Sequence, residues 1–399
     1  MATNPLAKPG AEIFPTHRLF RLKRQGSPRS LSQLPAFSCR LGEAPGARYT
    51  SEAKFDDILP GRSSAPRTEI MKIRVGVVGI GPLWESRHLP ALRALSDRFE
   101  ITAVCDPVQH RAALAARQLN AAVHDGYRAL TARQDVDAVL LLSPQWFGPL
   151  PIYAACEEGK AIYCAAALEL KDDEAMVLRD RVRESGIAFM AEFPCRLSPA
   201  TLRLKELIAT RLGTPRILFC NRRRTMEASG EHGTRCELDL VELIDWCRYV
   251  VDAEPSSLVA ISHNPRGDNC ADYFSLSLDF ADPTAGGKGA MAMIACGQYV
   301  PKSCEESLAY RRPADLKVVC DNGLAFVDLP NTVAWFDSAG QHLETLDHER
   351  PVGEQLLMHF HRAVESLVLK TASLEDAHRA LAIAALARQS CATGQRVYC

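Results

Sequence analysis

Long apolar runs, a surplus of charge and paired cysteine motifs are all missing from this 399-residue sequence. No apolar run reaches the roughly 20 residues that a membrane-spanning helix needs. The formal net charge of −1 argues against nucleic acid or an anionic membrane as a partner. The 14 cysteines are scattered through apolar stretches without a Cys-x-x-Cys pair, so we expect reduced, buried thiols. Together these absences predict a cytoplasmic protein.

Signatures of nucleophilic hydrolysis and of metal binding are also missing. The sequence has no Gly-x-Ser-x-Gly element and no cysteine obviously paired with a histidine, so hydrolysis by a nucleophilic side chain has no support. His359 and His361 resemble a metal-binding pair, but side chains two positions apart on a helix point to different sides. We therefore expect no metal site.

The first 70 residues differ from the rest of the chain. They are rich in Pro, Ser, Gly and Arg and show no sustained helix or strand period, so we expect a disordered extension. Residues 17–24 resemble the charged start of a targeting peptide, yet no apolar core follows them, which argues against a secretory signal. Met71 stands directly before the first expected strand, and our hypothesis is that it is the true start of the protein.

From residue 72 onward, short apolar runs alternate with amphipathic segments of helix length. This alternation is typical of βαβ units and predicts a doubly wound parallel sheet, the Rossmann fold, over residues 71–195. Gly159 and Gly186 stand where two of the helices should end. The expected strands are 73–78, 101–105, 138–142, 161–163 and 188–191, and the expected helices are 90–96, 110–119, 127–133, 150–158 and 174–184.

After Pro199 the pattern changes to one helix followed by a series of strands. Residues 274–280 alternate apolar and polar side chains, which favours a mainly antiparallel open sheet with helices on one face and a solvated or homo-oligomer-forming face on the other. We expect this α+β domain over residues 196–372, and a C-terminal helix, residues 373–399, that packs back on the body. The expected helices are 201–210, 355–367 and 374–392, and the expected strands are 216–222, 257–263, 273–280, 289–296, 316–320, 324–328 and 333–337.

The turn after the first strand carries two glycines, Gly79 and Gly81. Gly79 permits a tight strand-to-helix turn, and Gly81 lets the backbone approach a pyrophosphate at the start of the next helix, beside Pro82 and Leu83. Asp106 closes the next apolar run, where a carboxylate would accept hydrogen bonds from the adenosine ribose. The pattern therefore predicts a dinucleotide cofactor, NAD rather than NADP.

The same turn departs from the nucleotide-binding pattern at two positions. Pro82 has no N–H to offer a phosphate, and Trp84 occupies the place where a third small residue would allow close packing of the helix. Two glycines alone also fit an ordinary βα turn, which is the alternative interpretation.

Several short motifs follow one another along the chain. They are Gly79-Ile80-Gly81, His88-Leu89-Pro90-Ala91-Leu92, Val104-Cys105-Asp106-Pro107, Asp135-Val136-Asp137-Ala138-Val139 leading to Ser143-Pro144, Glu158-Gly159-Lys160 and Ser373-Leu374-Glu375-Asp376-Ala377. Their order and spacing, from residue 72 to residue 397, resemble the Gfo/Idh/MocA family, the glucose-fructose oxidoreductase and inositol dehydrogenase group.

This resemblance implies a function. Members of the family transfer a hydride between a sugar or polyol carbon and a nicotinamide, so the resemblance implies an NAD cofactor, a sugar-like small molecule as substrate and a homo-oligomer. It also implies that Ser143, Pro144 and Trp146 lie beside the cofactor, although Trp146 is equally explained as a core residue.

The chain departs from the family at a position that the resemblance implies to be catalytic. A Glu-Lys-Pro tripeptide follows the fourth expected strand in the family, and its lysine would stabilise a developing alkoxide. Here the tripeptide is Ala165-Ala166-Ala167. Lys171 lies further along the chain, where it can substitute for the missing lysine or be an ordinary solvated side chain.

A second departure concerns the helix that carries Asp-x-Gly-x-His-x-x-Asp in the family. The matching segment here is residues 238–245, with Glu242 in the histidine position and Asp245 retained. The two acids are three residues apart and share a helix face, so both can point into one cleft, with Glu242 as the base and Asp245 as a substrate ligand. The alternative is an ordinary helix salt bridge with residues such as Arg248.

One histidine is a candidate for the lost imidazole. His232 lies in a Gly-rich segment with Arg235 nearby, and it can replace the family's acid–base histidine or bind an anionic substrate group. An exposed loop histidine without a function is the alternative.

Three functions remain open on the sequence alone. The first is an NAD(P)-dependent oxidoreductase for a sugar, a polyol or a related small molecule, with an altered acid–base set. The second is a catalytically silent NAD-binding sensor or subunit partner, which the loss of two catalytic positions favours. The third is lyase or hydrolase chemistry through tightly bound NAD, which still needs a proton-transfer group.

Overall fold

The structure is a computed structural model, and it describes residues 71–165, 172–226, 232–263, 272–281, 289–366 and 372–399. All of these belong to one compact unit of the chain, residues 67–399. The expected extension, residues 1–70, lies outside the described residues, and the hypothesis that Met71 is the true start stays a prediction.

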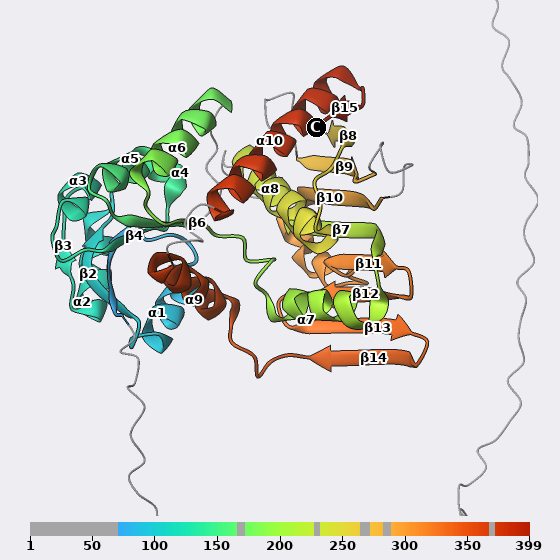
Figure 1. Cartoon of the computed structure of the whole chain (residues 1–399), viewed down its shortest axis with the longest axis horizontal. Helices are drawn as coiled ribbons and strands as arrows, with labels where there is room; N and C mark the ends of the chain where they lie inside the picture. Colours follow the sequence, from blue (N-terminus) through green and yellow to red (C-terminus); the bar gives the residue numbers. More distant parts are fainter. Residues whose placement is uncertain (1–70, 166–171, 227–231, 264–271, 282–288, 367–371) are drawn as a thin grey trace, which may run out of the picture. The chain divides into compact units, whose positions relative to one another are not determined.

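Six strands form the first sheet. They are β1 (Ile73–Val78), β2 (Phe99–Cys105), β3 (Ala122–Val123), β4 (Ala138–Leu141), β5 (Ala161–Cys164) and β6 (Phe189–Ala191). The order across the sheet is β3-β2-β1-β4-β5-β6, and every pair is parallel (Figure 1). Because the chain starts in the middle and winds outward in both directions, this is the doubly wound sheet that the sequence predicts.

Helices connect these strands and bury both faces of the sheet. β4 is apolar and buried at every position, and β1 is buried at every position except Arg74, as strands covered on both faces require. The connecting elements are η1 (Trp84–His88), α1 (Leu89–Ala94), α2 (Gln109–Leu119), α3 (Tyr127–Thr131), α4 (Pro144–Phe147), α5 (Leu150–Glu157) and α6 (Asp172–Ser185).

The element after the glycine turn differs from the regular helix expected over residues 90–96. A single π-helical turn, η1, comes first, and the short helix α1 follows it. The reason is Trp84, whose side chain is 3% exposed and packs in the core where a small residue would let the helix begin at once. β3 and α4 were not expected, because two and four residues are too short to show a period.

Nine strands form the second sheet. They are β7 (Pro215–Thr225), β8 (Ser257–His263), β9 (Tyr273–Asp279), β10 (Met291–Val300), β11 (Leu316–Cys320), β12 (Gly323–Asp328), β13 (Thr332–Asp337), β14 (Gly340–Thr345) and β15 (Val397–Tyr398). The order is β14-β13-β12-β11-β7-β10-β9-β8-β15. β7 and β10 are parallel and the other pairs are antiparallel, so the expected, mainly antiparallel sheet is confirmed.

Three helices cover one face of the second sheet. α7 (Pro199–Leu207) lies against β12 and β13, α8 (His232–Val251) against β7 and β10, and α10 (Ala372–Thr393) against β8 (Figure 1). The opposite face carries exposed apolar side chains, including Ile261, Met293 and Tyr299. Helices on one face are therefore confirmed. None of the helices in the described ranges combines the length and apolarity that crossing a membrane requires.

One helix from the second half of the chain belongs to the core of the first sheet. α9 (Val352–Glu365) contacts α1, η1 and β6. Its Phe360 is fully buried and stacks against Phe99, with ring centroids 6.5 Å apart, and the His361 ring bonds the carbonyl of Met71 at 2.8 Å. The chain therefore returns to the first sheet after β14, before α10 and the last strand of the second sheet, β15.

Candidate functional site

The glycine turn after β1 presses against the end of β4. Gly79 has a φ of +81°, and a Cβ atom there would lie 2.6 Å from the Cβ of Ser143. A Cβ atom at Gly81 would lie 2.2 Å from the carbonyl oxygen of Leu142. Only glycine allows this close approach, so the turn is held at the carboxyl edge of the sheet, where doubly wound folds bind nucleotides.

Asp106, at the end of β2, ties this turn to the neighbouring strand. Its Oδ2 accepts the N–H of Ile80 at 2.7 Å, and its Oδ1 accepts the N–H of Val108 at 2.8 Å and the Nε–H of Arg111 at 3.2 Å. The Asp106 side chain has no exposed surface. Its oxygens are therefore occupied by protein donors, whereas the sequence predicts an acceptor open to ribose hydroxyls.

Arg111 brings Trp146 into the same place. The guanidinium lies over the Trp146 ring, 4.6 Å from its centroid, and Trp146 is 50% exposed. Ser143 and Pro144 are buried, while Pro82 and Leu83 are exposed. An exposed indole face with a cation beside it suits an adenine ring, because the indole and the guanidinium can each stack on the π-system of adenine.

The expected cofactor residues thus lie together at one edge of the sheet, and they fit a dinucleotide. The glycine turn, the acid after β2 and the aromatic residue after β4 contact one another or share a partner. The Ile80 N–H is committed to Asp106, so the donors left for a pyrophosphate would be other N–H groups of the turn, such as that of Gly81.

A buried polar network stands where β5 and β6 end. Glu192, directly after β6, accepts a hydrogen bond from the Tyr163 hydroxyl at 3.0 Å, contacts His88 Nε2 at 3.1 Å and pairs with Arg87. Burial would raise the pKa of Glu192, but the hydrogen bond and charge of His88 and the charge of Arg87 lower it below its usual value. The carboxylate is therefore ionised, and it holds the Arg87 guanidinium in place.

Arg87 also depends on helix α9. A Cβ atom at Gly353 would lie 2.9 Å from the Arg87 carbonyl oxygen and 3.0 Å from its Cγ, so this glycine makes room for the arginine. The Arg87 side chain is 22% exposed, and its charge also acts on Glu242. Arg87 therefore pairs with Glu192, and its charge also contributes to the lowered pKa of Glu242.

Glu242 lies in a second charged cluster, on α8. Its carboxylate pairs with Arg222 of β7 and accepts a hydrogen bond from the Cys195 thiol at 3.0 Å. Burial would raise the pKa of Glu242, but the charge of Arg222 and the hydrogen bonds from Cys195 and Arg222 lower it. Its side chain remains 20% exposed. Glu242 is an ionised carboxylate with an open edge.

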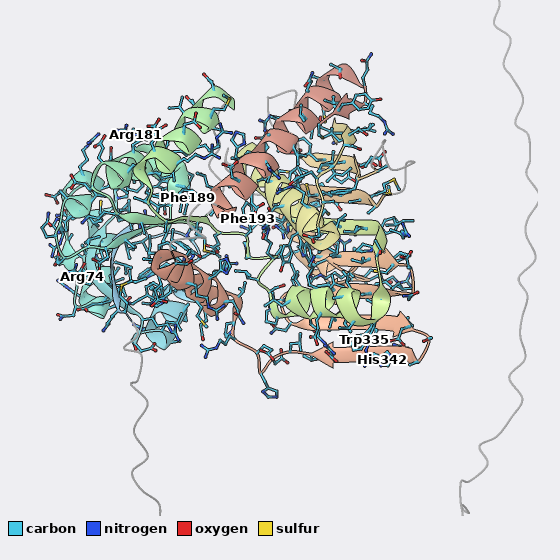
Figure 2. The ribbon with its side chains drawn as sticks, in the orientation of Figure 1. Arg74, Arg181, Phe189, Phe193, Trp335 and His342 are labelled. Carbon is cyan, nitrogen blue, oxygen red and sulfur yellow. The ribbon has the colours of Figure 1, made fainter. Side chains whose placement is uncertain are left out.

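Asp239, one helical turn before Glu242, extends the cluster. Its Oδ1 accepts a hydrogen bond from Arg222 at 3.0 Å and another from Arg224 at 2.7 Å. Cys195, in the segment after β6, and Arg222 of β7 therefore hold the Glu242 carboxylate, and Asp239 in turn holds Arg222. Phe193 in Figure 2 marks that segment, which leads from β6 toward α7.

Asp245 has different surroundings from Glu242. Its side chain is 1% exposed, pairs with Arg196 and bonds Arg248 at 3.2 Å. Burial raises the pKa of Asp245 to about 6, against the opposing charges of Arg196 and Arg248. The salt bridge with Arg248, which the sequence offers as the alternative, is present. Glu242 instead pairs with Arg222, so the two acids do not share one set of partners.

Three other candidates, namely His232, the tripeptide Ala165-Ala166-Ala167 and Lys171, fall partly or wholly outside the described residues. α8 begins at His232, so this residue stands at a helix start and not in a loop, but its side chain and that of Arg235 are not described. Ala165 is described and its N–H bonds the carbonyl of Leu141, whereas residues 166–171, including Lys171, are outside the described part.

Sequence reasoning missed the network around Glu192. One signal points to it, because an acidic residue directly after a parallel strand lies at the edge where doubly wound folds place their sites. His88 belongs to one of the motifs quoted above, and Arg222 stands in the basic run Arg222-Arg223-Arg224, but the sequence reveals no partner for either. His88 and Glu192 are 104 positions apart in the sequence, and Arg222 and Glu242 are 20 positions apart.

Comparisons with known proteins agree with this geometry. Residues 73–193 match a family model described as an oxidoreductase family with an NAD-binding Rossmann fold. Inositol 2-dehydrogenase 3 of Saccharopolyspora erythraea is 31% identical over 191 residues, which are 46% of this chain and 55% of that protein. A dTDP-3,4-didehydro-2,6-dideoxy-alpha-D-glucose 3-reductase of Streptomyces violaceoruber is 28% identical over 184 residues, which are 46% of this chain and 54% of that protein. The chain spans about half the length of the curated relatives it matches.

Solved structures extend the likeness in fold to nearly the whole described chain. The aldose-aldose oxidoreductase of Caulobacter crescentus, complexed with glycerol, superposes with a TM-score of 0.72 at 14% identity, over 82% of this chain and 100% of that one. A UDP-N-acetylglucosamine 3-dehydrogenase of Acidithiobacillus ferrooxidans superposes with a TM-score of 0.68 at 22% identity, over 82% of this chain and 100% of that one. At these identities the likeness shows the two-sheet fold alone.

Proposed function

We propose that this chain, whose residues 73–193 match the model of the Gfo/Idh/MocA oxidoreductase family, transfers hydride between a nicotinamide dinucleotide and a sugar, polyol or related small molecule. The observation that carries the proposal is the meeting of two groups of residues. The dinucleotide-binding turn lies at the edge of the first sheet, and Arg87, paired with Glu192 after β6, acts on Glu242 from α8.

The charged residues have distinct proposed roles. A bound nicotinamide dinucleotide would accept the hydride from the carbinol carbon or return it. Glu242 takes up the hydroxyl proton, since it is ionised and keeps an open edge. Arg87 stabilises the developing alkoxide, which is the part that the family's lysine would play. Asp245 positions Arg196 and Arg248, and His232, at the start of α8, stays a candidate for a second proton-transfer group.

The choice of dinucleotide depends on Asp106 and Arg111. An acid after the second strand favours NAD, because it accepts the ribose hydroxyls and repels a 2′-phosphate. Here Arg111 neutralises that acid at 3.1 Å and is itself 37% exposed. The proposed cofactor is NAD, with weak discrimination against NADP.

A second function is a silent NAD-binding sensor or subunit partner. The observation that favours it is the ion pair between Glu242 and Arg222, because a carboxylate with a lowered pKa is a weak base near neutral pH. The exposed apolar face of the second sheet, with Ile261 and Met293, supports the proposal of a homo-oligomer in either case.

The proposal is tested with the purified full chain in two steps. NADH binding is measured by fluorescence, and NAD(P)-dependent turnover is then measured on a panel that includes myo-inositol, D-glucose and D-xylose. We expect NADH to bind and at least one polyol or sugar to be oxidised. Glu242→Gln and Arg87→Gln should each lower kcat at least about a hundredfold while NADH affinity stays within about twofold.

The outcomes separate the two functions. NADH binding without turnover on the panel supports the silent protein, and absence of NADH binding contradicts both. Turnover that survives in the double variant Glu242→Gln, His232→Ala removes both residues as proton-transfer groups.

A further inference from the structure

Gln298 of β10 is a buried side chain whose polar atoms lack partners among the described residues. The residue is 2% exposed, and in that part of the chain neither the amide nitrogen nor the amide oxygen makes a hydrogen bond. Burying an unpaired amide typically costs about 1–3 kcal/mol by mutational measures. A glutamine in such a place is unfavourable for the fold alone, which is a reason to look for a ligand.

Gln298 lies in the same layer as the charged cluster on α8. On β10 the buried side chains alternate, at 292, 294, 296, 298 and 300, which places Gln298 on the face that the helices cover. Its neighbour on β7 is Arg224, and its backbone N–H bonds the carbonyl of Asp272 on the other side. Arg224 bonds Asp239, one helical turn from Glu242. Gln298 is therefore connected to Glu242 through two residues.

A primary amide matches one kind of ligand group especially well. It offers two N–H donors and one oxygen acceptor within a single planar group. A hydroxyl both donates and accepts, so two neighbouring hydroxyls satisfy both sides of the amide. Sugars and polyols carry such pairs of hydroxyls on adjacent carbons.

The charge of the cluster argues against an anionic ligand. Arg87 pairs with Glu192, Arg222 with Glu242, and Arg224 with Asp239. Each cation in this described cluster is therefore matched by a carboxylate, and Asp272 stands on the far side of Gln298. Phosphate and carboxylate groups are usually held by arginines that are not already neutralised.

We infer that Gln298 is a specificity-determining residue that binds hydroxyl groups of a neutral polyhydroxy ligand, in preference to a sugar phosphate, a sugar acid or a nucleotide sugar. This inference rests on the proposed function for the position of the ligand next to Glu242. It adds the substrate class and a residue that recognises it.

The test uses the full chain saturated with NADH, so that an alcohol binds without being oxidised. Calorimetry measures the affinity for myo-inositol, D-glucose, D-glucose 6-phosphate and D-glucuronate in the wild type and in Gln298→Met, which keeps the side-chain length and removes the amide. Gln341→Leu, on an exposed position of β14, is the control for loss of a glutamine amide.

We expect at least one neutral compound to bind more tightly than both anionic ones. Gln298→Met should weaken its binding about tenfold and change NADH affinity less than twofold, with an equal or higher Tm because the unpaired amide is gone. Gln341→Leu should leave neutral-compound and NADH affinities within about twofold of the wild type.

Three results would overturn the inference. The first is unchanged neutral-compound affinity in Gln298→Met. The second is a large fall in Tm together with loss of NADH binding, which would make the amide structural. The third is tighter binding of D-glucose 6-phosphate than of D-glucose. If Gln298-dependent binding is found but NAD(P)-dependent turnover is not, the inference stands and the proposed redox function fails.

Discussion

Arg111 covers the carboxylate of Asp106, and its replacement by alanine is expected to change the choice of dinucleotide. Loss of the guanidinium opens Oδ1 of Asp106 to the ribose hydroxyls and removes a cation that would attract a 2′-phosphate. We expect the ratio of NADPH to NADH affinity to fall about tenfold, since a charge-assisted hydrogen bond contributes about 1.5–3 kcal/mol. Fluorescence titration with both dinucleotides measures it.

Arg117→Ala is the matched control, because Arg117 is exposed on the same helix, α2. Arg117→Ala should leave the ratio of NADPH to NADH affinity unchanged. Equal effects of the two substitutions would mean that Arg111 acts only through the general charge of the helix.

The ion pair between Glu242 and Arg222 predicts a pH dependence of stability. The folded-state pKa of Glu242 lies below its ordinary value of 4.5, so the pair stabilises the fold above that pH, and this contribution is lost as the pH falls through the lowered pKa. Glu242→Gln should therefore unfold more easily than the wild type at pH 7, by roughly 1–3 kcal/mol, with a smaller difference at pH 3–4. Thermal unfolding at several pH values checks the sign, and a difference that grows toward low pH would contradict it.

At this scale the sequence predicts residue types better than their partners. The two acids on α8 are found as expected, but one pairs with Arg222 of a strand and the other with Arg196 and Arg248. Such pairings depend on where the second sheet lies relative to the helix, which one sequence does not reveal. Glu192 was missed because its partners come from η1 and β5, which only the folding of the first sheet brings next to the end of β6.

The strand-to-helix turn at Gly81 is the element most sensitive to one added methyl group. A Cβ atom there would lie 2.2 Å from the backbone carbonyl oxygen of Leu142, directly after β4, which cannot move away as a flexible side chain would. We expect Gly81→Ala to destabilise the protein by at least about 2 kcal/mol and to weaken NADH binding. Gly126→Ala is the control, because a Cβ atom at Gly126 has no neighbour within 4 Å. Similar unfolding free energies for both variants would refute this account.

Elements with a clear period were predicted to within a few residues. Ile73–Val78, Ser257–His263 and Leu316–Cys320 have the expected bounds, and α2 begins one residue early. The π-helical turn at Trp84 was not foreseen, because it results from tertiary burial of an indole. β14 was missed because its side chains are mostly polar and exposed.

At the scale of the whole molecule, α9 determines whether the first sheet has a complete core. Phe360 is fully buried, and its ring centroid lies 5.5 Å from that of Tyr163 in β5. Phe360→Ala should lower the free energy of unfolding by about 3–5 kcal/mol and weaken NADH binding, although it lies far along the chain from the glycine turn. Phe336→Ala, on the second sheet at 37% exposure, should cost much less. Chemical denaturation of both variants tests this, and equal losses would contradict it.

The return of α9 to the first sheet also bears on how this chain can be divided or recombined. The nucleotide-binding half is discontinuous in sequence, since it consists of the segment up to β6 and a helix that follows β14. A fragment ending near residue 195 would leave one face of its sheet without the side chains of α9. A genetic exchange that moves this half intact between proteins therefore requires crossovers at three places, after β6, before α9 and after α9, because α10 and β15 return to the second sheet.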